Sequence, residues 1–188
     1  MNSKELSGKP QKLSVWDICL TGVFTALTIV CAQISIPMPL GVPMTLQTLV
    51  IPLAGIVLGP WKGTLSVLAY IALGAVGLPV FSGFKGGPGV LFGLSGGFIL
   101  SFPLIALTAG LGEKRNHLAW YVCGLTAGTV INYACGMFFY SFAASASLRA
   151  AFTACVLPFI PTALIKLVLA GISGRKLKKV IGKRLPYH

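Results

Sequence analysis

A single lysine lies inside an apolar segment near the C-terminus. Residues 158–174 read PFIPTALIKLVLAGISG, and Lys166 is the one charged residue among them. The chain has only three acidic residues, Glu5, Asp17 and Glu113, and all are distant from this segment in the sequence. A charge inside a membrane is costly and marks a functional site, unless the side chain lifts it to the membrane surface. Lys166 therefore either extends to that surface or faces inward to bind an anionic ligand, and we favour the inward interpretation.

Further polar side chains are expected at the depth of Lys166. Thr45, Gln47 and Thr48 begin a predicted helix, and Asn132 and Tyr133 lie within another. Each alone is a weak signal, because such residues in membrane helices often only bond a neighbouring helix. Together they predict a small pocket, open to the outside and covered by loops.

Covalent chemistry finds no support in the sequence. The segment GLSG at 93–96 matches the G-x-S-G pattern of rhomboid-type serine proteases, whose serine needs a base. No histidine lies in a predicted membrane helix, since His117 is in a loop and His188 ends the chain. GFKGGPGVLFG lacks the order of a phosphate loop, and the five cysteines form no C-x-x-C pair. We therefore expect no enzyme, no metal site and no cofactor, and no ATPase in this chain.

The composition is that of a membrane protein. Apolar residues make up 55% of the 188 residues and charged residues 10%, whereas soluble domains contain about 25% charged residues. The mean hydropathy is +0.87. The net charge of +12 does not indicate nucleic-acid binding, because basic residues crowd directly after the last apolar segment, as at the cytoplasmic end of a membrane helix.

We expect an all-α integral membrane protein of six transmembrane helices, because Pro- and Gly-rich stretches divide the apolar sequence. A tail at 1–14 precedes a membrane domain at 15–173, and a basic tail at 174–188 follows it. The predicted helices are Val15 to Ile36, Leu46 to Leu58, Thr64 to Gly77, Val90 to Leu111, Leu118 to Phe142 and Pro158 to Ile172.

The basic residues indicate the orientation. Six spans place both termini on one side, and cytoplasmic segments are enriched in Lys and Arg. With both termini in the cytoplasm, only Lys85 and Arg149 lie in outer loops. The inner segments then hold Lys4, Lys9, Lys12, Lys62, Lys114, Arg115, Arg175, Lys176, Lys178, Lys179, Lys183 and Arg184.

Three stretches resemble the BioY family, the biotin-binding S components of energy-coupling factor (ECF) transporters. They are AQISIPMPLGVPMTLQTLVIPLAGIVLGPWKG at 32–63, GLPVFSGFKGGPGVLFGLSGGFIL at 77–100 and LPFIPTALIK at 157–166. The resemblance covers nearly the whole chain. It implies the S-component fold in the cell membrane, vitamin uptake, and a biotin site near the outer face. It also implies docking on a transmembrane coupling protein with two ATPases.

The resemblance also implies which residues act. S components present small residues of the first helix to the coupling protein, and Gly22, Ala26 and Val30 are spaced for this role or for contact within the bundle. The expected binding residues are Lys166, which holds the ligand carboxylate, and Thr45, Gln47, Phe84, Gly86, Gly87, Gly89, Phe98, Tyr133 and Ala163.

Several positions depart from the family pattern, among them Thr162, Leu94 and Ser95, and two further departures each lose a polar group. The family usually has PF-x-P-G-D-x-x-K near the last helix, and this chain has Ala163 at the position of the Asp. The family also has G-P-T-G-G-Y, and this chain has Phe98 at the position of the Tyr. Both changes remove polar groups that could bond a ureido ring. An alternative ligand is therefore a carboxylic acid with an apolar head, such as lipoate.

Overall fold

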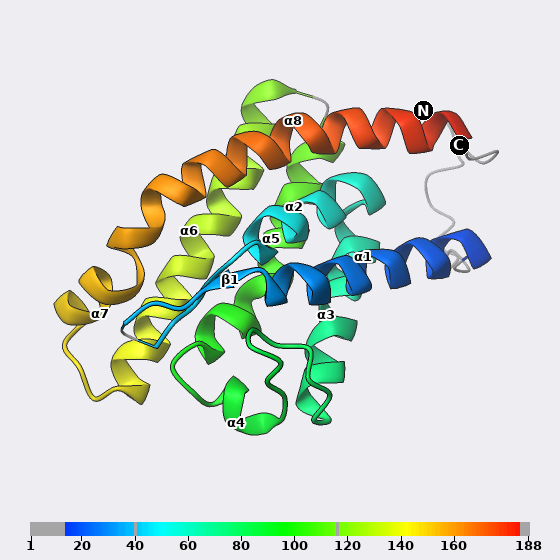
Figure 1. The fold of residues 1–188 in the computed structure, drawn as a ribbon. Helices are drawn as coiled ribbons and strands as arrows, with labels where there is room; N and C mark the ends of the chain where they lie inside the picture. Colours follow the sequence, from blue (N-terminus) through cyan, green and yellow to red (C-terminus); the bar gives the residue numbers. More distant parts are fainter. Residues whose placement is uncertain (1–13, 40, 116, 185–188) are drawn as a thin grey trace, which may run out of the picture.

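The computed structural model describes residues 14–39, 41–115 and 117–184, and these are mostly helical (Figure 1). The expected tail residues 1–13 and 185–188 lie outside the described residues. The helices are α1 (Val15–Gln33), α2 (Gln47–Leu58), α3 (Pro60–Ala75), α4 (Pro88–Leu91), α5 (Gly96–Lys114), α6 (Leu118–Ala143), α7 (Leu148–Cys155) and α8 (Ile160–Arg184), with a 3-10 turn η1 (Leu157–Phe159) before α8. Two short strands, β1 (Ser35–Ile36) and β2 (Met44–Thr45), pair antiparallel between α1 and α2.

Helix α5 forms the centre of the bundle, packed against α2, α3 and α6. Its residues Ile105, Ala106 and Ala109 are almost fully buried. Close packing depends on a glycine of α2, because a Cβ at Gly55 would lie 2.0 Å from the carbonyl oxygen of Ala106. Small residues at helix contacts are what membrane helices use to approach closely.

Four helical stretches of the described chain are long and apolar enough to cross a membrane. They are Val15–Gln33, Gly96–Lys114, Leu118–Ala143 and Leu148–Ile181. The 12 residues of α2 rise only about 18 Å, which is less than the roughly 30 Å of a bilayer core. The predicted all-α membrane fold is thus seen, whereas six complete spans are not established.

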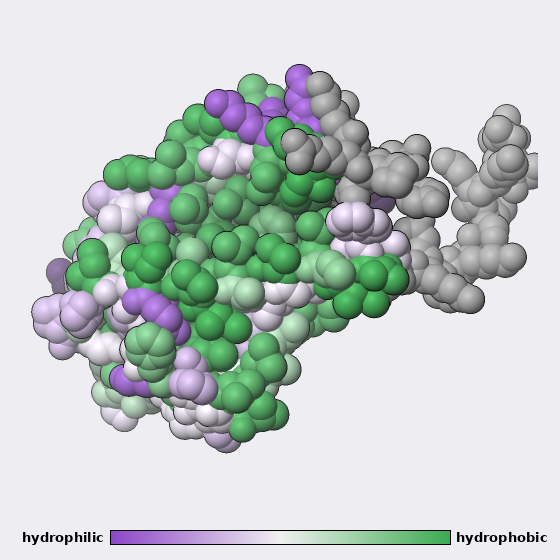
Figure 2. Space-filling view, turned by 45° about the vertical axis from the view of Figure 1, so that its right-hand side comes forward, coloured by the Kyte–Doolittle hydropathy of each residue, from purple (hydrophilic) through white to green (hydrophobic). Residues whose placement is uncertain are grey.

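The surface agrees with burial in a bilayer. Figure 2 shows a mainly apolar middle, with hydrophilic residues gathered at the upper edge and toward the lower left. Exposed side chains of this surface include Val23 and Leu27 on α1 and Leu164 and Val168 on α8. In water such a surface would be unfavourable, whereas lipid tails solvate it.

Several boundaries differ from the sequence predictions. The helix expected from Val90 begins at Gly96, since residues 88–91 form the separate turn α4. The helix expected from Thr64 begins at Pro60, a residue that fits the first helical position because its missing N–H has no role there.

Two regions expected to be loops contain structure. The amphipathic helix α7 buries Ala151, Ala154 and Cys155 within the stretch read as an outer loop. Helix α8 does not stop at Ile172 but continues through Arg184, into the segment expected to be a basic tail. Its last turns contain few apolar residues, so hydropathy alone gave too early an end.

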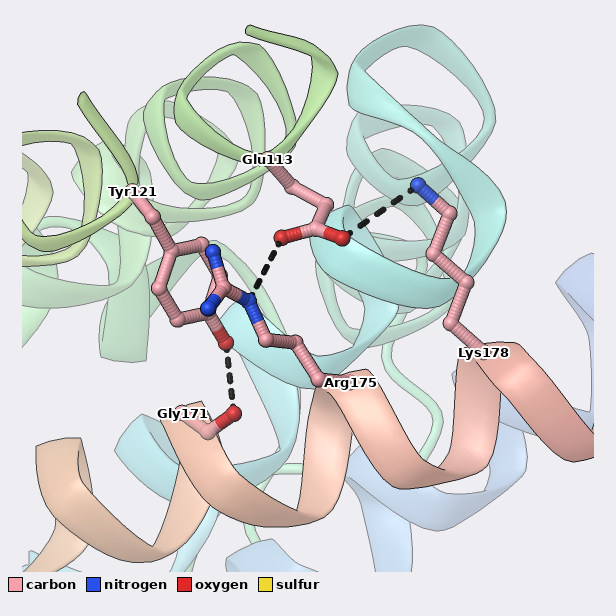
Figure 3. Close-up of polar contacts among 5 residues, drawn as sticks. All are labelled: Glu113, Tyr121, Gly171, Arg175 and Lys178. Carbon is pink, nitrogen blue, oxygen red and sulfur yellow. Dashed lines mark hydrogen bonds and ion pairs between the residues drawn. The ribbon is translucent and has the colours of Figure 1, made fainter. Parts of the chain in front are cut away.

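The acidic residues Asp17 and Glu113 form ion pairs at the end of the bundle opposite the N-terminus of α5. Lys62 Nζ lies 2.6 Å from Asp17 Oδ1. Glu113 Oε2 lies 3.3 Å from Arg175 Nε, and Glu113 Oε1 lies 3.6 Å from Lys178 Nζ (Figure 3). These contacts attach α1 to α3, and α5 to α8.

Candidate functional site

A pocket of about 100 Å³ opens among α2, α3, α5, α6, α8 and the loops before α2 and α4. Its polar residues are Thr45, Gln47, Thr48, Tyr70, Ser82, Lys85, Ser95, Asn132, Tyr133 and Lys166. Its apolar residues include Val42, Phe81, Val90, Phe98, Ile99, Phe102 and Phe159. Both loops and the N-terminal half of α5 lie at the bundle end away from the Glu113 ion pairs.

Lys166 faces the pocket rather than the lipid. It lies on the same face of α8 as the buried residues Ala163 and Ala170, whereas Leu164 and Ile165 point outward and are exposed. Its Nζ donates a hydrogen bond of 2.7 Å to the backbone carbonyl of Thr45. A lysine ammonium has three donors, so two remain for a ligand.

No described carboxylate neutralises Lys166. Asp17 and Glu113 are both paired with other cations at the opposite end of the bundle. Lys85 adds a second positive charge to the pocket lining. The described part of the pocket wall is therefore cationic, and an anionic ligand would be attracted to it.

Gln47 offers an unused donor. Its Oε1 accepts a 3.0 Å hydrogen bond from the Thr45 hydroxyl, which fixes the orientation of the amide. Its Nε2 is buried and has no hydrogen-bond partner of good geometry among the described residues, although the Tyr70 hydroxyl lies beside it. A buried donor without a partner costs about 1–3 kcal/mol, so a ligand acceptor at this place would be stabilised.

Asn132 offers an acceptor in the same pocket. It is 1% exposed, and its Nδ2 donates 2.8 Å hydrogen bonds to the Phe98 carbonyl and to Ser101 Oγ. Both amide hydrogens are thus occupied, which leaves Oδ1 as the available group. The pocket accordingly combines a cation, a donor and an acceptor between aromatic and aliphatic walls.

The structure brings five of the predicted binding residues together on the pocket wall. They are Thr45, Gln47, Phe98, Tyr133 and Lys166. Sequence reasoning did not select Tyr70, Ser82, Ser95 or Phe159 as binding residues, although they line the pocket too. Tyr70 offers one signal in the sequence, because its phenol lies within the apolar stretch 67–76.

Four predicted loop residues lie elsewhere. Phe84, Gly86, Gly87 and Gly89 are absent from the lining, and Phe84 is 73% exposed. The loop is held by Gln33, whose Nε2 donates to the carbonyls of Val80 and Phe81 and whose Oε1 accepts from the Phe84 N–H. Gly86 lets the loop pass close to its own backbone, since a Cβ there would lie 2.3 Å from the Leu78 carbonyl oxygen.

Ala163 also lies outside the pocket. It lines a separate apolar groove between α6 and α8, beside Leu164 and Leu167. Tyr133 is the one residue that lines both hollows among those described. Ala163, at the position of the family's Asp, therefore lines the groove in this structure, and its role at the head group stays a prediction.

The predicted docking residues share one exposed face. Gly22, Ala26 and Val30 all lie on the outer side of α1, and no atom comes within 4 Å of a Cβ placed at Gly22. They do not serve contact within the bundle. Their role in docking stays a prediction.

Comparisons with known proteins agree with this architecture. The chain is 46% identical over 160 residues to "Biotin transporter BioY" of Thermotoga maritima, covering 85% of this chain and 94% of that protein. It is 40% identical over 162 residues to "Probable biotin transporter BioY" of Pyrococcus horikoshii, covering 86% and 96%. A crystal structure of the S-component for biotin from an ECF-type ABC transporter superposes with a TM-score of 0.81 at 29% identity, covering 91% of this chain and 95% of that one.

The model of the BioY family matches residues 4–183, almost the whole chain. Relatives above 30% identity cover more than two thirds of the chain. Four described helical stretches are long and apolar enough to cross a membrane, and a pocket lies among the helices. The chain therefore belongs to the BioY family and is a membrane transporter component, not an enzyme.

Proposed function

We propose that this chain binds biotin in the pocket around Lys166, as the S component of an ECF transporter in the cell membrane. The observation that carries the proposal is the Lys166 ammonium, which lines a pocket where the described chain supplies no carboxylate. The relatives named as biotin transporters support the choice of ligand.

The chemistry of biotin matches the groups of the pocket. Its carboxylate binds Lys166 through a charge-assisted hydrogen bond, one of the stronger kinds. The ureido carbonyl accepts from Gln47 Nε2, and a ureido N–H donates to Asn132 Oδ1. The apolar atoms of the ligand pack against Phe98, Phe102 and other apolar walls.

The same proposal includes the arrangement in the membrane. Both termini face the cytoplasm and six helices cross or enter the bilayer, with the pocket toward the outside. The start of α1 and the end of α8 lie at the same end of the molecule, which supports this arrangement (Figure 1). Transport against a gradient then requires the coupling protein and two ATPases, since this chain has no phosphate-binding loop.

Titration of the detergent-purified protein with biotin and with lipoate tests the ligand. Tryptophan fluorescence or heat reports binding in both cases. We expect tight binding of biotin and much weaker binding of lipoate, because lipoate cannot bond Gln47 and Asn132 with its dithiolane. Binding of lipoate without binding of biotin would contradict the proposal. Phe98, which lacks the hydroxyl of the family's tyrosine, would then mark a change of ligand.

A further inference from the structure

Two hollows lie along the outer seam between α5 and α6, and they differ in charge. One, of about 500 Å³, is lined by apolar and small residues such as Leu104, Phe138 and Phe142, and no described cation lines it. The other, of about 580 Å³, lies at the opposite end of the seam and includes Lys114 and Arg115. Lys166 lines neither hollow, so the cations of the second hollow need a separate explanation.

The second hollow exists because glycines face each other across the seam. A Cβ at Gly124 would lie 2.4 Å from the carbonyl of Thr108 and 2.9 Å from the Cα of Gly112. The two backbones therefore pack directly and leave a groove on the lipid side. Exposed residues of α5 and α6, among them Leu111 and Cys123, form its apolar walls.

The cations stand where this groove ends. Lys114 is the last residue of α5, and Arg115 follows it. The Arg115 guanidinium lies 4.8 Å from the centre of the Trp120 ring, which positions it without using its N–H groups for bonding. Within the described residues neither cation has an acidic partner, because Glu113 is already paired with Arg175 and Lys178 (Figure 3).

We propose that this hollow binds an anionic phospholipid. One acyl chain lies in the groove between α5 and α6, and the phosphate binds Lys114 and Arg115. Basic pockets between membrane helices recognise anionic head groups in this way, and Trp120 lies at the level where tryptophan favours the membrane surface. The lipid belongs to the membrane leaflet on the side of Arg175 and Lys178. The proposal does not depend on which ligand the other pocket binds.

Native mass spectrometry of the purified full chain tests the proposal, with phosphatidylglycerol and phosphatidylcholine as probes. We expect the wild-type protein to retain phosphatidylglycerol in preference to phosphatidylcholine. The double variant Lys114→Gln/Arg115→Gln should bind phosphatidylglycerol roughly 30-fold more weakly, the effect of two cations at a membrane surface. The control Lys176→Gln/Lys179→Gln removes the same charge from exposed positions of α8 and should bind like the wild type.

A second variant tests the contribution of the groove separately from that of the two cations. Cys123→Trp fills the hollow and leaves both cations, so this variant should also lose phosphatidylglycerol. In a separate experiment, glycerol 3-phosphate should not compete with phosphatidylglycerol for the site. Circular dichroism and the melting temperature verify folding independently of ligand binding. The proposal would be overturned if the wild type retained the two lipids equally. It would also be overturned if the control variant lost phosphatidylglycerol as much as Lys114→Gln/Arg115→Gln does, or if Lys114→Gln/Arg115→Gln bound it like the wild type.

Discussion

At the scale of single residues, the sequence identified the cation of the pocket but not all of its neighbours. Lys166 was recognisable because a lone charge in an apolar segment is rare, and the structure indeed turns it toward the pocket. Phe84 does not line the pocket in this structure, because its loop is held by Gln33, which lies 51 residues earlier. Contacts over such distances leave no local pattern. Ala163 lines the groove between α6 and α8, a placement that depends on how these two helices pack.

Gln47 supplies a prediction at this scale. The variant Gln47→Leu keeps a similar volume and removes the buried Nε2, so biotin should bind about 5-fold more weakly, the effect of one neutral hydrogen bond. Equilibrium titration measures this change. Thr64→Val is a suitable control, because Thr64 bonds Pro60 and lies outside the pocket lining. An unchanged affinity of Gln47→Leu would show that its amide does not contact the ligand.

Asn132 supplies another residue-scale prediction. Asn132→Asp keeps the acceptor but removes the donors to Phe98 and Ser101, and it adds a negative charge to a pocket expected to hold an anion. We expect both a lower melting temperature and a loss of biotin binding of 10-fold or more, roughly the cost of breaking buried hydrogen bonds. Ser101→Ala removes only one partner and should have a smaller effect on binding. A similar affinity of Asn132→Asp and wild type would contradict the placement of the ligand beside Asn132.

At the scale of elements, segment types were predictable and their ends less so. Helix positions follow from apolar stretches separated by Pro and Gly, which is why the long helices appear near the predicted ranges. The paired strands β1 and β2, and the helix α7, were not expected, because segments this short owe their structure to packing on the bundle. The continuation of α8 through Arg184 was missed because polar helices lack the hydropathy signal.

Two glycines give a matched test of helix packing. Gly55→Ala places a methyl group 2.0 Å from the Ala106 carbonyl, so α2 and α5 must separate. Overpacking of this kind costs about 1–3 kcal/mol, and the melting temperature should fall. Gly22→Ala meets no atom within 4 Å and should leave the melting temperature equal or higher, since alanine favours helices. The same melting temperature for both variants would contradict the packing described here.

The exposed face of α1 gives a prediction about partners. Gly22→Leu adds a bulky side chain to a surface without contacts in the bundle, so the isolated protein should still bind biotin with unchanged affinity. Uptake of biotin by cells that supply the coupling protein and ATPases should be lost, because the added side chain blocks the small face predicted to dock on the coupling protein. Lys166→Ala is the contrasting variant, with both binding and uptake reduced. Normal uptake by Gly22→Leu would rule out docking through this face.

At the scale of the whole molecule, charge is divided between the two ends of the bundle. One end holds ion pairs and most of the basic residues that the structure describes, and the other holds a pocket whose lining carries Lys166 and Lys85. A ligand that supplies a carboxylate to the second end neutralises a cation there. We therefore predict that Lys166 holds the carboxylate of biotin.

A thermodynamic cycle of ligand and protein tests the contact between Lys166 and the carboxylate. Biotin and its neutral amide are titrated into the wild-type protein and into Lys166→Gln. We predict that the wild type prefers biotin over the amide by about 10-fold or more, the effect of a charge-assisted hydrogen bond, and that Lys166→Gln binds the two ligands equally. An unchanged preference for biotin in Lys166→Gln would contradict the account and would assign the carboxylate to another group.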